Sequence, residues 1–302
     1  MTELKNELDV YRKKCTFDVK ELKKLVEDEE VTRMKEKFWD YLAADPIFSK
    51  PKHRMDPHAL RKLNFIRALR MTHFDSLDYK IHLADVLGLN YIICCQLFDG
   101  SLAVKLGVWV GFFRSSVFGL GSDEQRADIL PRIYANEIKG CVAMTEVGHG
   151  TNVKQLQTRA TYDVESEGFY IHSPDFSAAK CWVGNLAWSS THAALYAQLI
   201  LPNGVCEGVH AFLIPVRDPT TGAAYPGLTI GDMGDKEGMN GLDNGFIMFK
   251  TIGSPGLLSS PAFLPSLPQE NIPPLLKTLT SASVLTYTLI HRSMVCAWVR
   301  MG

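Results

Sequence analysis

The residues best suited to chemistry lie in the stretch "MTEVGHGTNV", Met144 to Val153. Threonines, a histidine, an acid and glycines gather here, at the point where the β-prone run "CVAM" ends. Threonine hydroxyls and the backbone amides of a glycine turn can bind the polar edge of a ligand. The stretch also fits an ordinary sharp turn. Both interpretations stay open on these residues alone.

A second candidate is the stretch "AAKCWVGNLAW", which ends at Trp188. Cys181, Trp182 and Trp188 offer large apolar surfaces where a strand is expected to turn, and Gly184 lies between the two tryptophans. Core packing would explain these residues. Alternatively, Trp182 and Gly184 form a wall beside a flat cofactor, because glycine lets the backbone come close to a ring.

Several common catalytic signatures do not occur in the sequence. There is no G-x-S-x-G, no H-E-x-x-H and no G-x-x-x-x-G-K-[ST]. Gly119 and Gly121 form a G-x-G without the third glycine of a dinucleotide fingerprint. The histidines of the second half do not cluster, which is more typical of structural side chains than of metal ligands. We therefore predict no metal site and no Rossmann domain.

The elements expected to position these candidates are helices in the first part of the chain and strands in the second. Residues 1–140 predict an N-terminal α-helical domain, with helices at about 83–98, 101–118 and 123–137. Ser122 begins the last of these with "SDEQ", where Gln125 can return the cap's hydrogen bond as a capping box.

At Cys141 the pattern changes to short β-prone runs separated by turns, which predicts an antiparallel sheet or small barrel over residues 141–250. The fold class is therefore α+β. Residues 251–302 form a divergent tail rich in Pro, Ser and Leu, with one possible helix in "LLKTLTSASVLTYTLIHRSMVCAWVRM".

Composition excludes several function classes. The 302 residues carry 32 basic and 33 acidic side chains, so no global field attracts nucleic acid. The most apolar run, Leu83 to Phe98, is too short to cross a bilayer and contains Asp85, so we predict no membrane span. The 7 cysteines form no C-x-x-C pair, and this predicts reduced thiols inside a cell.

The motifs of the β region resemble those of one enzyme family when they are taken in order. "CVAMTEVGHGTNV", "GFYIHSPDFSAAKCWVGNLAWSSTHAALYAQLI", "GVHAFLIPVRDP" and "PGLTIGDMGDKEGMNGLDNGF" together look like the peroxisomal acyl-CoA oxidases. The resemblance is strong over about 110 residues and extends to about four fifths of the chain. It implies the acyl-CoA dehydrogenase and oxidase fold, in which helical domains and a β domain surround FAD.

The resemblance also implies roles for two residues. Thr145 occupies the position of the threonine that meets the flavin in the family motif T-E-x-G-H-G-T, and Gly184 that of the glycine in K-x-W-x-G. Both are predicted cofactor-binding residues. Glu146, Gly148, Gly150 and Asn152 are expected to shape the loop, and so is His149. The implied reaction converts acyl-CoA to trans-2-enoyl-CoA, and dioxygen becomes hydrogen peroxide.

The sequence departs from the family pattern in two places. Relatives have a "GGLGK" turn where this chain has "GNLAWSS", and after Lys250 the segment "TIGSPGLLSSPAFLPSLP" replaces the family's continuation into long helices. The family's catalytic glutamate belongs to that continuation, so no catalytic residue is assigned here. The sequence predicts a C-terminally truncated or alternatively spliced form.

Two alternatives to a working oxidase remain. One is an inactive family member that binds acyl-CoA or FAD, or serves as a dimerisation module; the other is an antiparallel lipid-binding module unrelated to flavin. The family implies a homodimer and a peroxisomal location. The C-terminus "AWVRMG" is not a peroxisomal signal of the S-K-L type, so a cytoplasmic location is the alternative.

Overall fold

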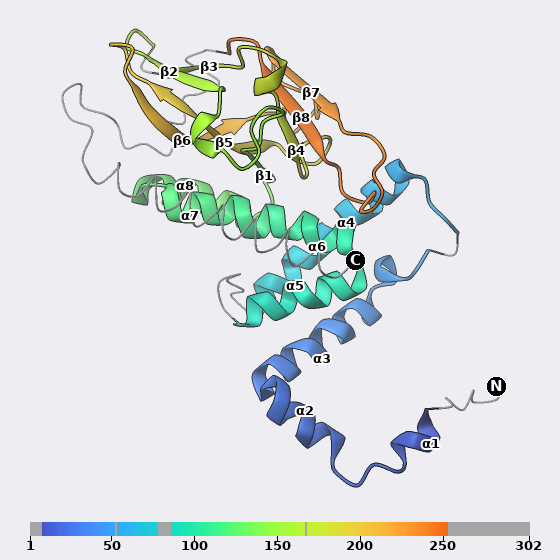
Figure 1. Ribbon diagram of the computed structural model, residues 1–302. Helices are drawn as coiled ribbons and strands as arrows, with labels where there is room; N and C mark the ends of the chain where they lie inside the picture. Colours follow the sequence, from blue (N-terminus) through green and yellow to red (C-terminus); the bar gives the residue numbers. More distant parts are fainter. Residues whose placement is uncertain (1–7, 52, 78–85, 167, 253–302) are drawn as a thin grey trace.

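The computed structural model describes residues 8–51, 53–77, 86–166 and 168–252. The expected helix in the tail therefore lies outside the described residues. Helices come first along the chain and strands follow from Gly140 onward (Figure 1). The longer helices are α2 (Val19–Glu27), α3 (Glu29–Ala44), α4 (Pro57–Leu77), α5 (Val86–Phe98) and α8 (Asp123–Tyr134). The shorter ones are α1 (Asp9–Arg12), α6 (Gly100–Leu106), α7 (Arg114–Leu120) and the 3-10 turns η1 (Pro46–Phe48), η3 (Val153–Gln155) and η4 (Phe176–Ala178).

The helices begin where the sequence places capping residues. The hydroxyl of Ser122 accepts from the Gln125 amide, and the Gln125 side chain accepts from the Ser122 amide, so the predicted capping box of α8 is confirmed. Asp99 caps α6 in a similar way through the amides of Ser101 and Leu102.

A continuous helical stretch runs from α6 through the π-helical segment η2 (Gly107–Phe113) into α7. This stretch, Gly100–Leu120, has the length and mean hydropathy of a membrane span. More than half of it is buried inside the protein, as in the core helix of a soluble protein. Leu102 and Leu106 pack there with α4 and α5, and Trp109 of η2 belongs to the same apolar cluster. Its apolar character is explained by burial within the fold.

The strands form two sheets. The first contains β1 (Gly140–Ala143), β2 (Arg159–Asp163), β3 (Gly168–His172), β5 (His192–Ile200) and β6 (Cys206–Pro215). The second contains β4 (Lys180–Val183), β7 (Leu228–Asp232) and β8 (Gly245–Phe249).

The first sheet is mixed, which corrects the expectation of a purely antiparallel domain. β1 and β2 both run parallel to β5, while β6 runs antiparallel to it. β1 pairs with the first half of β5 and β2 with the last part, on residues 192–195 and 198–200. The connections that create parallel pairs are long, and turn signals in the sequence do not reveal their direction. The segment 144–158 therefore leaves the edge of β5 and returns to it a few residues further on.

The strand β4 lies where the sequence predicts a strand to turn, but its residues carry no regular β pattern. It is short, it contains a fully buried lysine, and its pairing with β8 shifts register between Lys180 and Val183. Such a bulge interrupts the alternation that identifies a strand. The expected β runs coincide with the other strands of the structure: "CVAMTE", "QTRATYDV", "GFYIHS", "HAALYAQLIL", "VHAFLIPV", "LTIGDM" and "GFIMFK".

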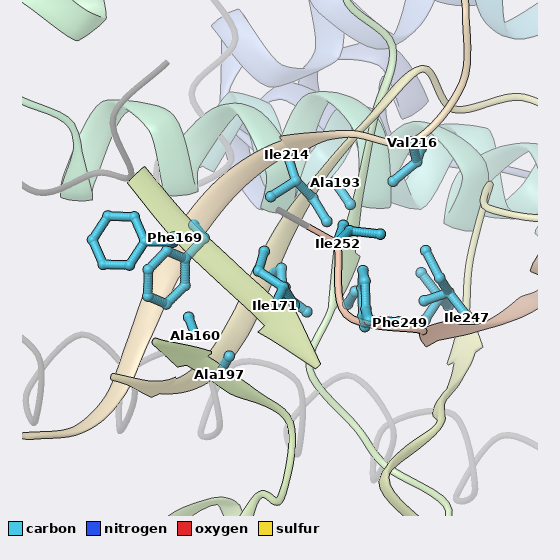
Figure 2. Packing of buried hydrophobic residues seen from close by; sticks show 14 of the residues in the cluster. Ala160, Phe169, Ile171, Ala193, Ala197, Ile214, Val216, Ile247, Phe249 and Ile252 are labelled. Carbon is cyan, nitrogen blue, oxygen red and sulfur yellow. The ribbon is translucent and has the colours of Figure 1, made fainter. Parts of the chain in front are cut away.

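The two sheets enclose one apolar core. Phe169, Ile171 and Ile214 of the first sheet pack with Ile247 and Phe249 of β8 (Figure 2). The opposite side of the first sheet is covered by η2, α7 and α8, with Phe113, Val117 and Ile129 against Tyr196 and Leu213 (Figure 1). The strands and their connections, residues 140–252, form a β part that lies as a layer on the helices. Segment 144–158 connects β1 to β2 within this β part.

Candidate flavin site

The segment after β1 makes a tight loop that is tied to β4. Within the loop the amide of Glu146 donates to the carbonyl of His149 at 3.0 Å, and the His149 amide donates back at 3.1 Å. Toward β4, the amide of Cys181 donates to the carbonyl of Thr145 at 2.9 Å. Glu146 and Lys180 form an antiparallel bridge. The two sequence motifs that carry the resemblance therefore lie side by side.

Thr145 and Glu146 face opposite sides of this loop. The Glu146 side chain is fully buried and pairs with the buried Lys180 at 2.9 Å. Neighbouring residues in extended backbone point to opposite faces, so Thr145 and its partner Cys181 turn toward the outer side. Thr145 is half-buried, and its hydroxyl has no hydrogen-bond partner among the described residues. A ligand on the outer side could bind this hydroxyl.

Trp182 lies beside this outer face in a rare backbone conformation. Its φ is 57° and its side chain is 58% exposed. Positive φ in a bulky residue is an outlier that persists only where the surroundings impose it. Here the bulge of β4 turns the indole outward, and the Asn244 side chain donates to the Trp182 carbonyl at 3.4 Å. The exposed indole is available as a wall for a flat ligand.

Gly184 is buried at the end of β4, and close packing around it explains why the residue is a glycine. A Cβ at this position would lie 3.2 Å from Val108 Cγ2 and 3.8 Å from Leu242. The missing side chain therefore admits η2 and the loop before β8. Any contact of Gly184 with a cofactor would have to come from its backbone.

A second buried ion pair holds the turn that follows Gly184. The Lys105 ammonium of α6 pairs with Asp243 and donates to Asn185 Oδ1 at 3.0 Å and to Ser189 Oγ at 2.7 Å. Burial lowers the pKa of Lys105, although Asp243 opposes the shift. Burial disfavours the Asp243 carboxylate, yet Lys105 and Ser189 outweigh it, and the pKa of Asp243 lies below its ordinary value. Lys105 thus attaches the turn to helix α6.

The residues that depart from the family turn have identifiable contacts. Asn185 accepts from Lys105 and donates to its carbonyl at 2.9 Å. The Trp188 indole donates to Asp232 at 2.9 Å and its ring meets His58 edge to face. The substitutions in "GNLAWSS" therefore form bonds with the helices and with the segment around residue 232.

The structure separates the expected site residues into two groups. Thr145 is bonded to Cys181, and Trp182 follows Cys181 in β4 with an exposed position, whereas Gly184 lies inward against η2. His149 bonds to Glu146 Oε2 at 3.2 Å and supports the loop. Sequence reasoning missed Lys180 and Lys105 as members of the site, although each stands as a lone charge in an apolar run. Among the described residues, no group of three or more His, Cys, Asp or Glu could hold a metal.

Comparison with known proteins gives one family model and several relatives. Residues 141–252 match the acyl-CoA dehydrogenase middle domain. Over 250 residues the chain is 40% identical to the human peroxisomal acyl-coenzyme A oxidase 3, and the match covers 82% of this chain and 36% of that protein. It is 46% identical to acyl-coenzyme A oxidase of Saccharomyces cerevisiae over 160 residues, 52% of this chain and 21% of that one.

Solved structures agree with these relatives. Acyl-CoA oxidase 1 of Yarrowia lipolytica superposes with a TM-score of 0.75 at 31% identity, covering 82% of this chain and 36% of that one. Acyl-CoA oxidase-1 of Caenorhabditis elegans, complexed with FAD and ATP, gives a TM-score of 0.67 at 32% identity, covering 86% and 40%. The chain spans well under half the length of the proteins it matches. The α+β fold expected from the resemblance is confirmed by these neighbours.

Proposed function

The chain belongs to the acyl-CoA oxidase family, and from this membership we propose that it provides the flavin-binding part of an FAD-dependent acyl-CoA oxidase. In the proposed reaction an acyl-CoA thioester loses an α-proton and a β-hydride to become trans-2-enoyl-CoA, and dioxygen is reduced to hydrogen peroxide. FAD supplies the hydride acceptor. The residues of this chain bind and orient that group.

The observation that carries the proposal is the side-chain hydroxyl of Thr145, which is unpaired within the part of the chain that the structure describes. Its hydroxyl is half-buried, has no partner among the described residues, and belongs to a loop whose backbone is tied to β4. A hydroxyl held in this way can donate to the polar edge of an isoalloxazine ring. Trp182 offers an exposed aromatic surface from the neighbouring strand, and Gly184 can contribute backbone groups. These features fit a flat, polar-edged cofactor.

A second candidate function, a flavin-binding or acyl-CoA-binding module without turnover, is favoured by one specific observation. Glu146 is the only acid in segments 144–153 and 180–184, and its side chain is fully buried. Burial disfavours its carboxylate, but Lys180 and the amides of Gln157 and Thr158 outweigh that effect, so its pKa lies below the ordinary value. A general base must reach the proton that it removes. Glu146 faces inward and does not meet that condition.

The remaining assignments follow from the family and are part of the proposal. The substrate is an acyl-CoA, the assembly is a homodimer, and the location is peroxisomal, with the cytoplasm as the alternative. The human relative carries the word peroxisomal in its name.

The test begins with the purified 302-residue chain. We would record its flavin absorbance and then measure peroxide release with straight and branched acyl-CoA substrates. The oxidase proposal predicts bound FAD together with peroxide. Bound FAD without peroxide would support the module that does not turn over. A folded, colourless chain that does not bind added FAD would contradict the oxidase proposal and the flavin-binding form of the second candidate.

A further inference from the structure

The buried carboxylate of Glu146 connects three separate segments of the β part. Its Oε1 accepts from Lys180 Nζ at 2.9 Å, from the Thr158 amide at 2.9 Å and from the Thr158 hydroxyl at 2.7 Å. Its Oε2 accepts from the Gln157 amide at 2.7 Å. The segment before β2, the strand β4 and the loop after β1 therefore meet at this one group.

Lys180 contacts the loop on both sides of Thr145. Its ammonium donates to the Met144 carbonyl at 3.0 Å as well as to Glu146. The Thr145 carbonyl is meanwhile bound by the Cys181 amide at 2.9 Å. Residues 144, 145 and 146 are thus each bonded to β4, the first and last through Lys180 and Thr145 through Cys181. The direction of the Thr145 side chain is determined by these bonds.

A buried ion pair is weak evidence of stability, because desolvation of the two charges offsets much of their attraction. Burial lowers the pKa of Lys180 to about 8, against the opposing effect of Glu146. Apolar residues of similar size could fill the same space, but they could not bind the Met144 carbonyl and the amides at 157 and 158. What the pair contributes beyond packing is the position of the backbone.

We propose that Glu146 and Lys180 are positioning residues for the cofactor edge: they hold the Thr145 loop against β4 in its binding arrangement before any flavin is present. The expected effect of the pair on FAD binding rests on the proposed flavin function. The loop arrangement itself is a property of the free chain. The two parts can therefore be tested separately.

The principal variant is the double substitution Glu146→Gln with Lys180→Met. It removes both charges together, so no unpaired charge remains buried, and it nearly preserves side-chain size. The control is Glu27→Gln with Lys35→Met, which removes an ion pair of 3.1 Å between α2 and α3, far from the loop in sequence. Thr158→Val is a milder variant that deletes one hydroxyl bond to Glu146. It replaces the double variant if that protein does not fold.

The first measurement is amide hydrogen exchange in the free chain, with circular dichroism and urea unfolding as checks of the fold. We expect residues 145–150 and 181 to exchange at least about tenfold faster in the double variant, while the strands β5 and β6 keep their protection. Thr158→Val should give a smaller increase at the same amides. Unchanged exchange in the loop would overturn the proposal. Acceleration spread evenly over the β part would also overturn it, because a pair that only stabilises the fold predicts such even acceleration.

The second measurement is the Kd for FAD, from the change in flavin fluorescence on titration. We expect a weakening of about tenfold in the double variant and no change in the control, since a loosened loop must be ordered on binding. An unchanged Kd in a folded double variant would overturn the proposal. If the unmodified chain binds no FAD, the flavin function fails, whereas the exchange experiment still decides whether the pair positions the loop.

Discussion

The two buried ion pairs of the site differ in what they connect. Glu146 and Lys180 lie entirely within the β part and bond to the backbone on both sides of Thr145. Lys105 and Asp243 join a helix to a turn of the β part and bond to the side chains of that turn. The arrangement around Thr145 is therefore local to the sheets. The arrangement after Gly184 depends on docking of the helices.

The largest effect is expected from breaking the pair that joins the two parts. Lys105→Met leaves Asp243 buried without its cation, and loss of one partner of a buried pair costs about 3–5 kcal/mol. We expect a fall of this size in the free energy of unfolding measured with urea. Lys35→Met, at a pair near the surface, should cost less than about 1 kcal/mol. Equal effects of the two variants would show that Lys105 does not connect the parts as described.

Acid should act on His192 of β5, which lies near Arg132 of α8 and Lys139. Burial, together with Arg132 of α8 and Lys139, lowers the pKa of His192 to about 4 from its ordinary value of 6.5. Between these pH values the unfolded chain binds more protons than the folded one, so stability falls as the pH falls through this window. The total loss attributable to His192 is up to about 3 kcal/mol. His192→Gln should flatten the dependence of urea unfolding on pH, and an unchanged slope would contradict this assignment.

The close approach of η2 to Gly184 gives a smaller effect. Gly184→Ala places a methyl group 3.2 Å from Val108 Cγ2, and such overpacking should cost about 1–2 kcal/mol. Val108→Ala makes room for that methyl group, so the double variant should be less destabilised than the sum of the single ones. Urea unfolding of the four proteins gives the coupling free energy. Additive effects would mean that Val108 is not the group that requires a glycine here.

The smallest effect is expected at His149, within the Thr145 loop. Its ring bonds to Glu146 at 3.2 Å, but Lys180 and the segment 157–158 already bind that carboxylate. His149→Gln should lower the free energy of unfolding by less than about 1 kcal/mol. A loss as large as that of Lys105→Met would show that His149 carries the loop, contrary to the comparison of the two pairs.

The sequence predicts much of this fold because most elements carry their own local signals. The capping box of Ser122 and the continuous apolar runs of β5 and β6 are examples of such signals. The direction of β1 and β2 carries none, since parallel pairing depends on where a long connection returns. The bulge that turns Trp182 outward is likewise imposed by pairing with β8.

In the candidate site too, some features have a local sequence signal and others depend on long-range contacts. Thr145 and Gly184 could be named from motifs, whereas the bond of Lys180 to Glu146 joins residues 34 positions apart and follows only from the fold. The contact of Lys105 with Asp243 spans 138 positions. Pairs this far apart in the sequence cannot be predicted from residue spacing. Each lysine interrupts an apolar run, and this is the signal that could have drawn attention to them.

The central claim is that this chain binds a flavin edge through Thr145, and titration of the purified chain with FAD tests it most directly. Flavin fluorescence would be followed for the unmodified protein and for Thr145→Val, which removes the hydroxyl and nearly preserves the shape. We predict saturable binding that Thr145→Val weakens by roughly two- to tenfold, the value of one hydrogen bond. Equal affinities for the two proteins, or no saturable binding by either, would contradict the claim.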